Sequence, residues 1–288
     1  MCGIVGLFLK HPGLEPELGG HLAAMLATMR DRGPDSAGFA VFGRDDGTVK
    51  NTVRGPGLSA LAARLELNAD LRDTHAVLHV PASRMGEVRT ALASDPAVTI
   101  VGEGQRMELY KEVGLPADVA ARFGLSAMAG THGIGHTRMA TESAVTTNGA
   151  HPYTTGPDQC LVHNGSLSNH NALRRRLVRE GYAFETENDT EVAAAYLSWR
   201  MREGDTLEGA LHAGLKDLDG FYTFVVGTRT GFAVLRDPVC CKPAVMAETE
   251  EWVAFGSEYR ALVNLPGIAD ARVWEPEPAR VYAWERAA

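Results

Sequence analysis

The first three residues, Met1-Cys2-Gly3, constrain this chain more than any other stretch of its sequence. Initiator methionine is readily removed before a small side chain, and its removal would leave Cys2 with a thiol and a free α-amine. One residue would then carry both a nucleophile and a base. Residues 2–9 form a continuous apolar run, which predicts a buried strand that holds this terminus rigidly. The alternative is a structural cysteine buried at the start of a strand.

Composition and charge exclude several classes of function. Of the 288 residues, 45% are hydrophobic and 22% are charged, which is typical of a globular protein with a sizeable core. The net charge is -8 and no run is rich in Lys or Arg, which argues against nucleic acid or an anionic membrane as the main partner. No apolar stretch is long enough to span a bilayer, and the N-terminus lacks the basic and apolar regions of a signal peptide. We therefore expect a cytoplasmic protein.

The cysteines do not indicate a metal site. Cys2, Cys160, Cys240 and Cys241 lack metal-like spacing, and in the cytoplasm they should be reduced. The adjacent pair Cys240-Cys241 is most simply explained by two neighbours on opposite faces of a strand. We expect no metal in this chain.

Hydrophobic periodicity predicts a mixture of helices and strands. Helices are expected over residues 17–30, after an N-cap at Ser168, after Asn188-Asp189-Thr190 and from Thr206. Strands are expected at residues 2–9, 39–42, 48–53, 77–80, 130–138, 159–163, 221–226, 232–235, 243–246, 252–255, 272–275 and 281–284, with a hairpin turn at Asp45-Asp46-Gly47. This order favours an α+β layered fold over alternating βαβ units. We expect a single domain over residues 2–288, with an insertion at about 55–130 where periodicity is weak.

Polar residues at the ends of the predicted elements are candidates for chemistry. Arg138 ends a strand, where a guanidinium would grip a carboxylate or form a structural ion pair. Asn164-Gly165 closes another strand and would supply two oxyanion donors, although Asn-Gly is also a common turn dipeptide. Asp189 opens a helix, either as a plain N-cap or as an acceptor for a substrate ammonium group. His151 is a ligand or a loop-ordering residue. Taken singly, none of these residues decides the function.

Taken together, the motifs resemble a known family. They occur in the family's order and comprise Met1-Cys2-Gly3-Ile4-Val5-Gly6, Arg32-Gly33-Pro34-Asp35-Ser36-Ala37-Gly38, His136-Thr137-Arg138-Met139-Ala140-Thr141, His163-Asn164-Gly165, Asn188-Asp189-Thr190-Glu191 and Arg236-Asp237-Pro238 with Lys242-Pro243. The chain resembles the class II glutamine amidotransferases, whose glutaminase domain is of the N-terminal-nucleophile (Ntn) type. That domain occurs in amidophosphoribosyltransferase, glucosamine-6-phosphate synthase, asparagine synthetase and glutamate synthase. The resemblance implies a four-layer αββα sandwich of the Ntn hydrolase type.

The resemblance also implies roles for individual residues. Cys2 would be the nucleophile, with its own α-amine as the base through a water, and Asn164 and Gly165 would form the oxyanion hole. Arg138 would bind the α-carboxylate of L-glutamine and Asp189 its α-ammonium group. Thr141 and His151 would order the pocket. The reaction implied is hydrolysis of glutamine to glutamate and ammonia.

Two departures from the family pattern indicate a branch. Met139 stands where an aromatic residue often follows the arginine, and Glu142 stands where several members have histidine. Both favour the glutamate synthase-like branch. The stretch over residues 142–153 resembles the small amidotransferase subunit of N-methylglutamate synthase.

The sequence lacks the motifs of an acceptor domain. It has no phosphate-binding loop, dinucleotide fingerprint or iron–sulfur cysteine run, and it ends just after the last predicted strand. We therefore expect no cofactor in this chain and a separate glutamate synthase-like large subunit that carries FMN and iron–sulfur clusters, in a hetero-oligomer. Residues 55–130 would form part of that interface. Two other functions stay open, namely an Ntn amidase or acylase acting on another amide, and a non-catalytic scaffold subunit of the same complex.

Overall fold

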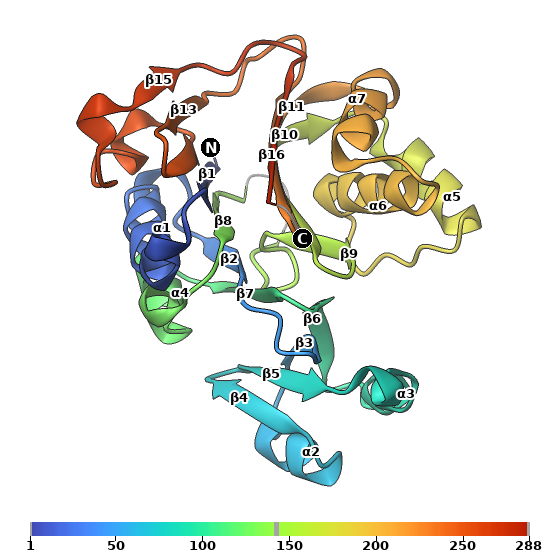
Figure 1. The fold of residues 1–288 in the computed structure, drawn as a ribbon. Helices are drawn as coiled ribbons and strands as arrows, with labels where there is room; N and C mark the ends of the chain where they lie inside the picture. Colours follow the sequence, from blue (N-terminus) through green and yellow to red (C-terminus); the bar gives the residue numbers. More distant parts are fainter. Residues whose placement is uncertain (1, 141–143, 287–288) are drawn as a thin grey trace.

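A computed structural model describes residues 2–140 and 144–286 of the chain, and its main body has four layers (Figure 1). Two antiparallel sheets face each other, and helices cover the outer face of each. The first sheet has the strand order β15-β13-β14-β1-β8-β2-β7. Its strands are β1 (Gly3–Leu9), β2 (Ser36–Phe42), β7 (Met107–Val113), β8 (His132–Arg138), β13 (Val245–Glu248), β14 (Trp252–Gly256) and β15 (Arg272–Trp274).

The second sheet has the order β16-β12-β11-β10-β9. Its strands are β9 (Tyr153–Gly156), β10 (Gln159–Leu167), β11 (Gly220–Thr228), β12 (Gly231–Arg236) and β16 (Val281–Glu285). The first sheet is covered by α1 (Leu18–Ala27) and α4 (Pro116–Arg122), and the second by α5 (His170–Arg179), α6 (Asp189–Arg202) and α7 (Leu207–Asp217).

Three apolar clusters hold these layers together, one at each interface. The cluster between α1, α4 and the first sheet includes Leu22, Leu26 and Phe39. The cluster between the two sheets includes Ile4, Phe42 and Phe232. The cluster between the second sheet and its helices includes Leu177, Tyr196 and Phe224.

Strand β1 shows why the N-terminal run is continuously apolar. Val5 and Leu7 pack toward the helices, whereas Ile4 and Phe8 pack between the sheets, so alternate residues are buried on opposite faces. A strand that is covered on both faces cannot alternate apolar with polar residues. The predicted α+β fold, a four-layer αββα sandwich, is confirmed.

A third sheet lies outside these four layers. It has the order β4-β5-β3-β6, with helices α2 (Leu58–Arg64) and α3 (Met85–Ala93) packed on it around a cluster of its own. Its strands are β3 (Val49–Arg54), β4 (Asn68–Arg72), β5 (His75–Val80) and β6 (Thr99–Gly104). The segment expected as an insertion at about 55–130 thus contains two parts. The separate sheet spans residues 49–104, whereas β7 and α4 belong to the main layers.

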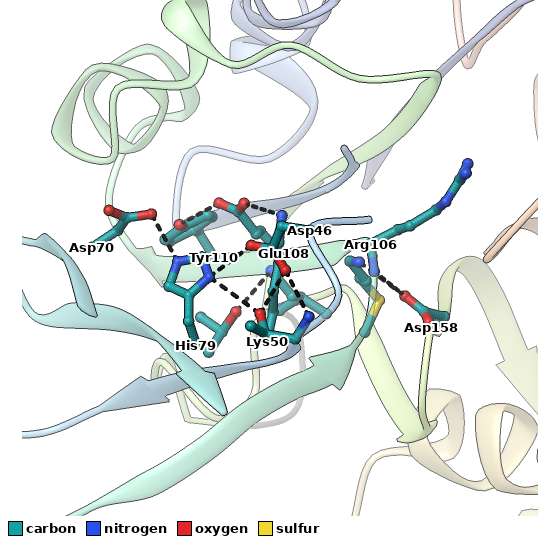
Figure 2. Close-up of polar contacts among 12 residues, drawn as sticks. Asp46, Lys50, Asp70, His79, Arg106, Glu108, Tyr110 and Asp158 are labelled. Carbon is teal, nitrogen blue, oxygen red and sulfur yellow. Dashed lines mark hydrogen bonds and ion pairs between the residues drawn. The ribbon is translucent and has the colours of Figure 1, made fainter. Parts of the chain in front are cut away.

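Polar contacts fix the third sheet to the body of the protein (Figure 2). Lys50 on β3 forms an ion pair of 3.0 Å with Glu108 on β7, which also accepts a hydrogen bond from the hydroxyl of Tyr110. At the turn between β6 and β7, the carboxylate of Asp158 accepts the backbone N–H groups of residues 105–107 at 2.8–2.9 Å. Three N–H donors converging on one carboxylate tie this turn to the loop before β10.

Four local predictions are wrong. Residues 45–47 do not form a hairpin turn, because β2 pairs with β7 and β8 whereas β3 pairs with β5 and β6. The strand predicted at 159–163 continues to Leu167. Helix α5 begins at His170 after Asn169, while the Ser168 hydroxyl bonds to Asp219 instead. Cys240 and Cys241 lie between β12 and β13 in a loop, not on a strand.

Candidate active site

A cleft of about 740 Å³ opens where β1, β8 and β10 meet the start of α6. Six of the predicted site residues line it: Cys2, Arg138, His151, Asn164, Gly165 and Asp189. Thr141, the remaining predicted residue, lies outside the described residues, as does Glu142. Cys2 and Asp189, which are 187 positions apart in the chain (189 minus 2), therefore line the same cleft.

Strand register brings the first two of these residues together. β1 and β8 are antiparallel, with Gly3 opposite Thr137. One residue beyond this pair, Cys2 and Arg138 reach the same edge of the first sheet. Gly3 packs so closely against Met29 and Thr137 that a Cβ would overlap both, so a larger residue at this position would displace its neighbours.

Cys2 is fixed through its backbone carbonyl. The carbonyl oxygen accepts a hydrogen bond from Arg32 Nε at 2.9 Å and another from Asn164 Nδ2 at 3.2 Å. Arg32 is 8% exposed, and its Nη1 pairs with Glu258 at 2.7 Å. The main chain of Cys2 is thereby held by the turn before β2 on one side and by β10 on the other, and Cys2 lines the cleft.

Asn164 and Gly165 lie within β10 rather than at its end. Asn164 is 4% exposed, and its side-chain amide has a second N–H beyond the one bonded to Cys2. Gly165 has a φ of +154°, and a Cβ there would overlap the carbonyl oxygen of Phe221 on β11. Glycine is required at this position because the two strands approach too closely for any side chain.

Arg138 places its guanidinium in the wall of the cleft. The side chain is 6% exposed, and Nη1 donates to the carbonyl of Ala144 at 3.3 Å. The loop after β8 is fixed in turn by Asp35, whose carboxylate accepts the N–H of Ala140 at 2.8 Å and whose own N–H donates to Arg138 O at 3.1 Å. A planar cation held in this way is suited to bind a carboxylate.

Asp189 is the first residue of α6, and Asn188 is its N-cap, accepting the N–H of Thr190 at 2.8 Å. One oxygen of Asp189 accepts the N–H of Leu167 at 2.8 Å, and the other lies 3.6 Å from His163 Nδ1. Burial by itself raises the pKa of Asp189, but His163 and the Leu167 N–H outweigh it and lower the pKa to about 2. The carboxylate is therefore ionised at any physiological pH.

Three buried histidines, His136, His151 and His163, lie together, and the last two line the cleft. His136 and His151 stack with their ring centroids 4.0 Å apart, and His136 Nε2 lies 3.2 Å from the carbonyl of His163. Thr190 Oγ1 lies 3.0 Å from His163 Nδ1 and 3.3 Å from His151 Nε2. Burial lowers the pKa of His136 to about 3 and that of His151 well below its ordinary value. These two rings are therefore neutral, and His151 lines the cleft.

Sequence reasoning did not assign site roles to Arg32, His163, Lys242 or Glu258. The first three fall within the motifs that carried the resemblance, so a signal was present. Lys242 lines the cleft with its ammonium 4.9 Å from the ring of Phe221, in a loop whose carbonyls are held by Arg236. Glu258 has no sequence signal, because it reaches Arg32 from 226 residues away.

Comparison with known proteins agrees with this geometry. The model of a family described as a glutamine amidotransferase domain matches residues 136–264. The glutamine amidotransferase-like protein GlxB of Rhizobium meliloti is 61% identical, over 99% of this chain and 98% of that protein. The chain belongs to the class II glutamine amidotransferases, and it is an enzyme of that family. A putative glutamine amidotransferase of Methanothermobacter thermautotrophicus is 33% identical, over 98% of this chain and 99% of that protein.

Solved structures show the same fold. Glutamine phosphoribosylpyrophosphate amidotransferase from B. subtilis, complexed with ADP and GMP, has a TM-score of 0.65 and 21% identity to this amidotransferase. The match covers 99% of this chain but only 47% of that one, so this chain spans about half the length of that enzyme. At such low identity the likeness supports the αββα fold alone. No helix within residues 2–140 and 144–286 is long and apolar enough to cross a membrane.

Proposed function

We propose that this chain hydrolyses L-glutamine to glutamate and ammonia through a thioester on Cys2, and supplies the nitrogen to a separate synthase subunit. One observation carries the proposal, which is that Arg138 and Asp189 line the same cleft as Cys2. The α-carbon of glutamine carries a carboxylate and an ammonium group. One fixed cation and one fixed anion match this pair, and an amidase acting on a different amide has no need of them.

The proposed chemistry uses groups already in place. With Met1 removed, the α-amine of Cys2 takes the thiol proton through a water, and the thiolate attacks the side-chain amide carbon. The negative oxygen that develops is stabilised by the second Asn164 N–H and the backbone N–H of Gly165. The C–N bond breaks, ammonia leaves with the proton, and a γ-glutamyl thioester forms on Cys2. Water then adds to the thioester carbon, releasing glutamate and restoring the thiol.

We further propose that the acceptor of the nitrogen is held by a glutamate synthase-like large subunit that carries FMN and iron–sulfur clusters, as in N-methylglutamate synthase. Support comes from residues 142–153, which resemble the small subunit of that enzyme, and from Met139 after the arginine. Purification of the complex from its source tests this. A co-purifying large subunit with flavin absorbance is expected, and a complex with a protein of any other class would contradict the assignment.

Steady-state kinetics with Arg138→Ala test the glutamine assignment. A charge-assisted contact with the substrate carboxylate is worth about 1.5–3 kcal/mol, so the KM for glutamine should rise at least about tenfold. Arg229 lies in the exposed turn between β11 and β12 and does not line the cleft, so Arg229→Ala should leave the KM unchanged. Both are measured with and without the co-purified partner. Cleavage of another amide, with glutamine turnover indifferent to Arg138→Ala, would favour the amidase alternative.

A further inference from the structure

A second cavity, of about 530 Å³, lies between the third sheet and the body of the enzyme. The third sheet contributes the end of β3 and most of β6, and the body contributes β9 and residues 181–186. β6 lies beside β9 at this junction (Figure 1). The cavity is distinct from the glutamine cleft, although Tyr153 and Thr186 line both.

Several charged groups around this cavity already have partners within its wall. Arg89 pairs with Glu103, and Arg202 pairs with acidic residues on its own side of the cavity. The carboxylate of Glu191 accepts three hydrogen bonds, from the N–H of Glu185 and from the N–H and hydroxyl of Thr186. These side chains therefore already have hydrogen-bond or ion-pair partners within the protein.

Three other charged groups form no ion pair with any residue that the structure describes. Arg54 donates to a neutral acceptor, Asn148 Oδ1, at 2.8 Å. The ammonium of Lys111 contacts two backbone carbonyls at 3.3 and 3.4 Å and lies 4.5 Å from the centre of the Tyr153 ring. The carboxylate of Glu185, at the exposed rim, makes no hydrogen bond or ion pair with any residue in 2–140 or 144–286. Two cations and one anion of the cavity thus lack a directly bonded partner of opposite charge among the described residues, whereas the carboxylate of Glu191 has its hydrogen bonds taken by neutral donors.

Burial shifts the pKa values of two of these groups, which also act on each other across the cavity. Burial lowers the pKa of Lys111 to about 8, even though Glu185 and Glu191 raise it. Burial also raises the pKa of Glu185, and repulsion from Glu191 adds to the effect, whereas Lys111 and Arg54 oppose it. Each charged form would gain from an opposite charge placed beside it.

We propose that this cavity is a second ligand site, which binds an acidic α-amino acid such as L-glutamate. Two carboxylates of the ligand meet Arg54 and Lys111, its ammonium group meets Glu185, and its methylene chain lies against Tyr153 and Ile100, which line the cavity. A neutral amino acid leaves one of the two cations without a partner. The cavity volume is ample for a molecule of this size.

The walls of this site are also walls of the glutamine cleft. Residues 147 and 148 line the cavity while residues 144, 146 and 149 line the cleft, so a single loop separates them. On the other side, the segment that presents Glu185 and Thr186 to the cavity continues into Asp189 in the cleft. A ligand in the cavity is therefore in contact with the two segments that shape the cleft.

Hydrogen–deuterium exchange on the wild-type chain with L-glutamate separates the cavity from the cleft. Residues 99–103 on β6 line the cavity and are absent from the cleft, so their amides report on the cavity alone. We expect saturable protection of residues 99–103 and 181–186, weaker with glutarate, which lacks the ammonium group. Protection confined to peptides of the cleft, or protection of neither region, would overturn the proposal. The readout does not depend on glutamine hydrolysis, so its failure is separate from failure of the proposed function.

Matched variants assign the charges. Titration of the β6 protection should give an affinity for glutamate at least about tenfold weaker in Arg54→Met, with partial recovery in Arg54→Lys. Arg89→Met removes an arginine of the same cavity that Glu103 already neutralises, and should change the affinity less than about twofold. Equal losses in the two methionine variants would contradict the assigned role of Arg54. Thermal unfolding confirms that each variant is folded, and the wild-type result stands without them.

Discussion

The clamp on the Cys2 carbonyl gives a prediction that separates positioning from substrate binding. Arg32 donates to Cys2 O at 2.9 Å and pairs with Glu258 at 2.7 Å, and it is absent from the lining of the cleft. Arg32→Met should therefore misplace the nucleophile without removing any contact to glutamine. A hydrogen bond from a charged donor is worth about 1.5–3 kcal/mol, and each 1.4 kcal/mol is tenfold in rate. We expect kcat to fall about 10- to 100-fold, while the KM changes less than about threefold.

A matched control exists on the same carboxylate. Arg260 pairs with Glu258 at 2.7 Å, but it makes no contact with Cys2. Arg260 is more exposed than Arg32, so Arg260→Met should leave kcat within about twofold of the wild-type value. The assay is glutamate release under steady-state conditions, with thermal unfolding to confirm that both variants are folded. Equal kcat losses in the two variants, or a loss that falls on KM alone, would refute the reasoning.

Three further predictions follow from the geometry. Asp189→Asn should raise the KM for glutamine at least about tenfold. Because the pKa of Asp189 is about 2, its contribution to binding is present above the ordinary carboxyl pKa and is lost only as the pH falls toward 2. A wild-type KM that already rose between pH 7 and 5 through this group would contradict the account. Asp158→Asn should lower the free energy of unfolding in urea titrations by about 2–3 kcal/mol, since an amide cannot accept three N–H groups as a carboxylate does. Asp270→Asn, at an exposed position, should change the free energy of unfolding by less than about 0.5 kcal/mol. Equal effects of the two substitutions would contradict this prediction. Gly165→Ala should abolish activity or lower the melting temperature by several degrees, because its Cβ would overlap a backbone carbonyl. Gly86 lies in α3 with free space around the position of a Cβ, so Gly86→Ala should be neutral or stabilising. A fully active and equally stable Gly165→Ala enzyme would show that the strands can separate.

The main layers could be predicted from the sequence because burial leaves a clear signal. A strand that is covered on both faces, such as β1, is apolar throughout, and helices such as α5 show a regular apolar stripe. Neither pattern says which strands pair. That is why a turn between β2 and β3 was expected where the chain instead leaves the first sheet for the third.

The third sheet was the hardest part to predict, for a physical reason. Its edge strand β4 has no buried residue, and β6 contains two glycines and a register shift against β3, so neither shows a regular alternation. Short strands that are only partly covered do not need a strict apolar pattern. β7, by contrast, is mostly buried over Met107–Val113 and belongs to the first sheet.

The candidate site shows a similar division. Residues inside ordered motifs, such as Cys2, Arg138 and Asp189, could be named in advance, and the structure brings them to one cleft. Supporting contacts that cross the fold could not, since nothing in the sequence around Glu258 indicates that it faces Arg32. A position in a motif predicts which residue matters, whereas its partner depends on the tertiary structure.

The central claim is that a freed amino-terminal thiol attacks glutamine, and covalent labelling measures this directly. Mature protein is treated with a glutamine-like diazoketone, and its intact mass and peptides are then determined. The account predicts loss of Met1 and a single adduct on Cys2, with labelling slowed by glutamine. Retained methionine, or an adduct on Cys240 or Cys241 with Cys2 unmodified, would contradict it.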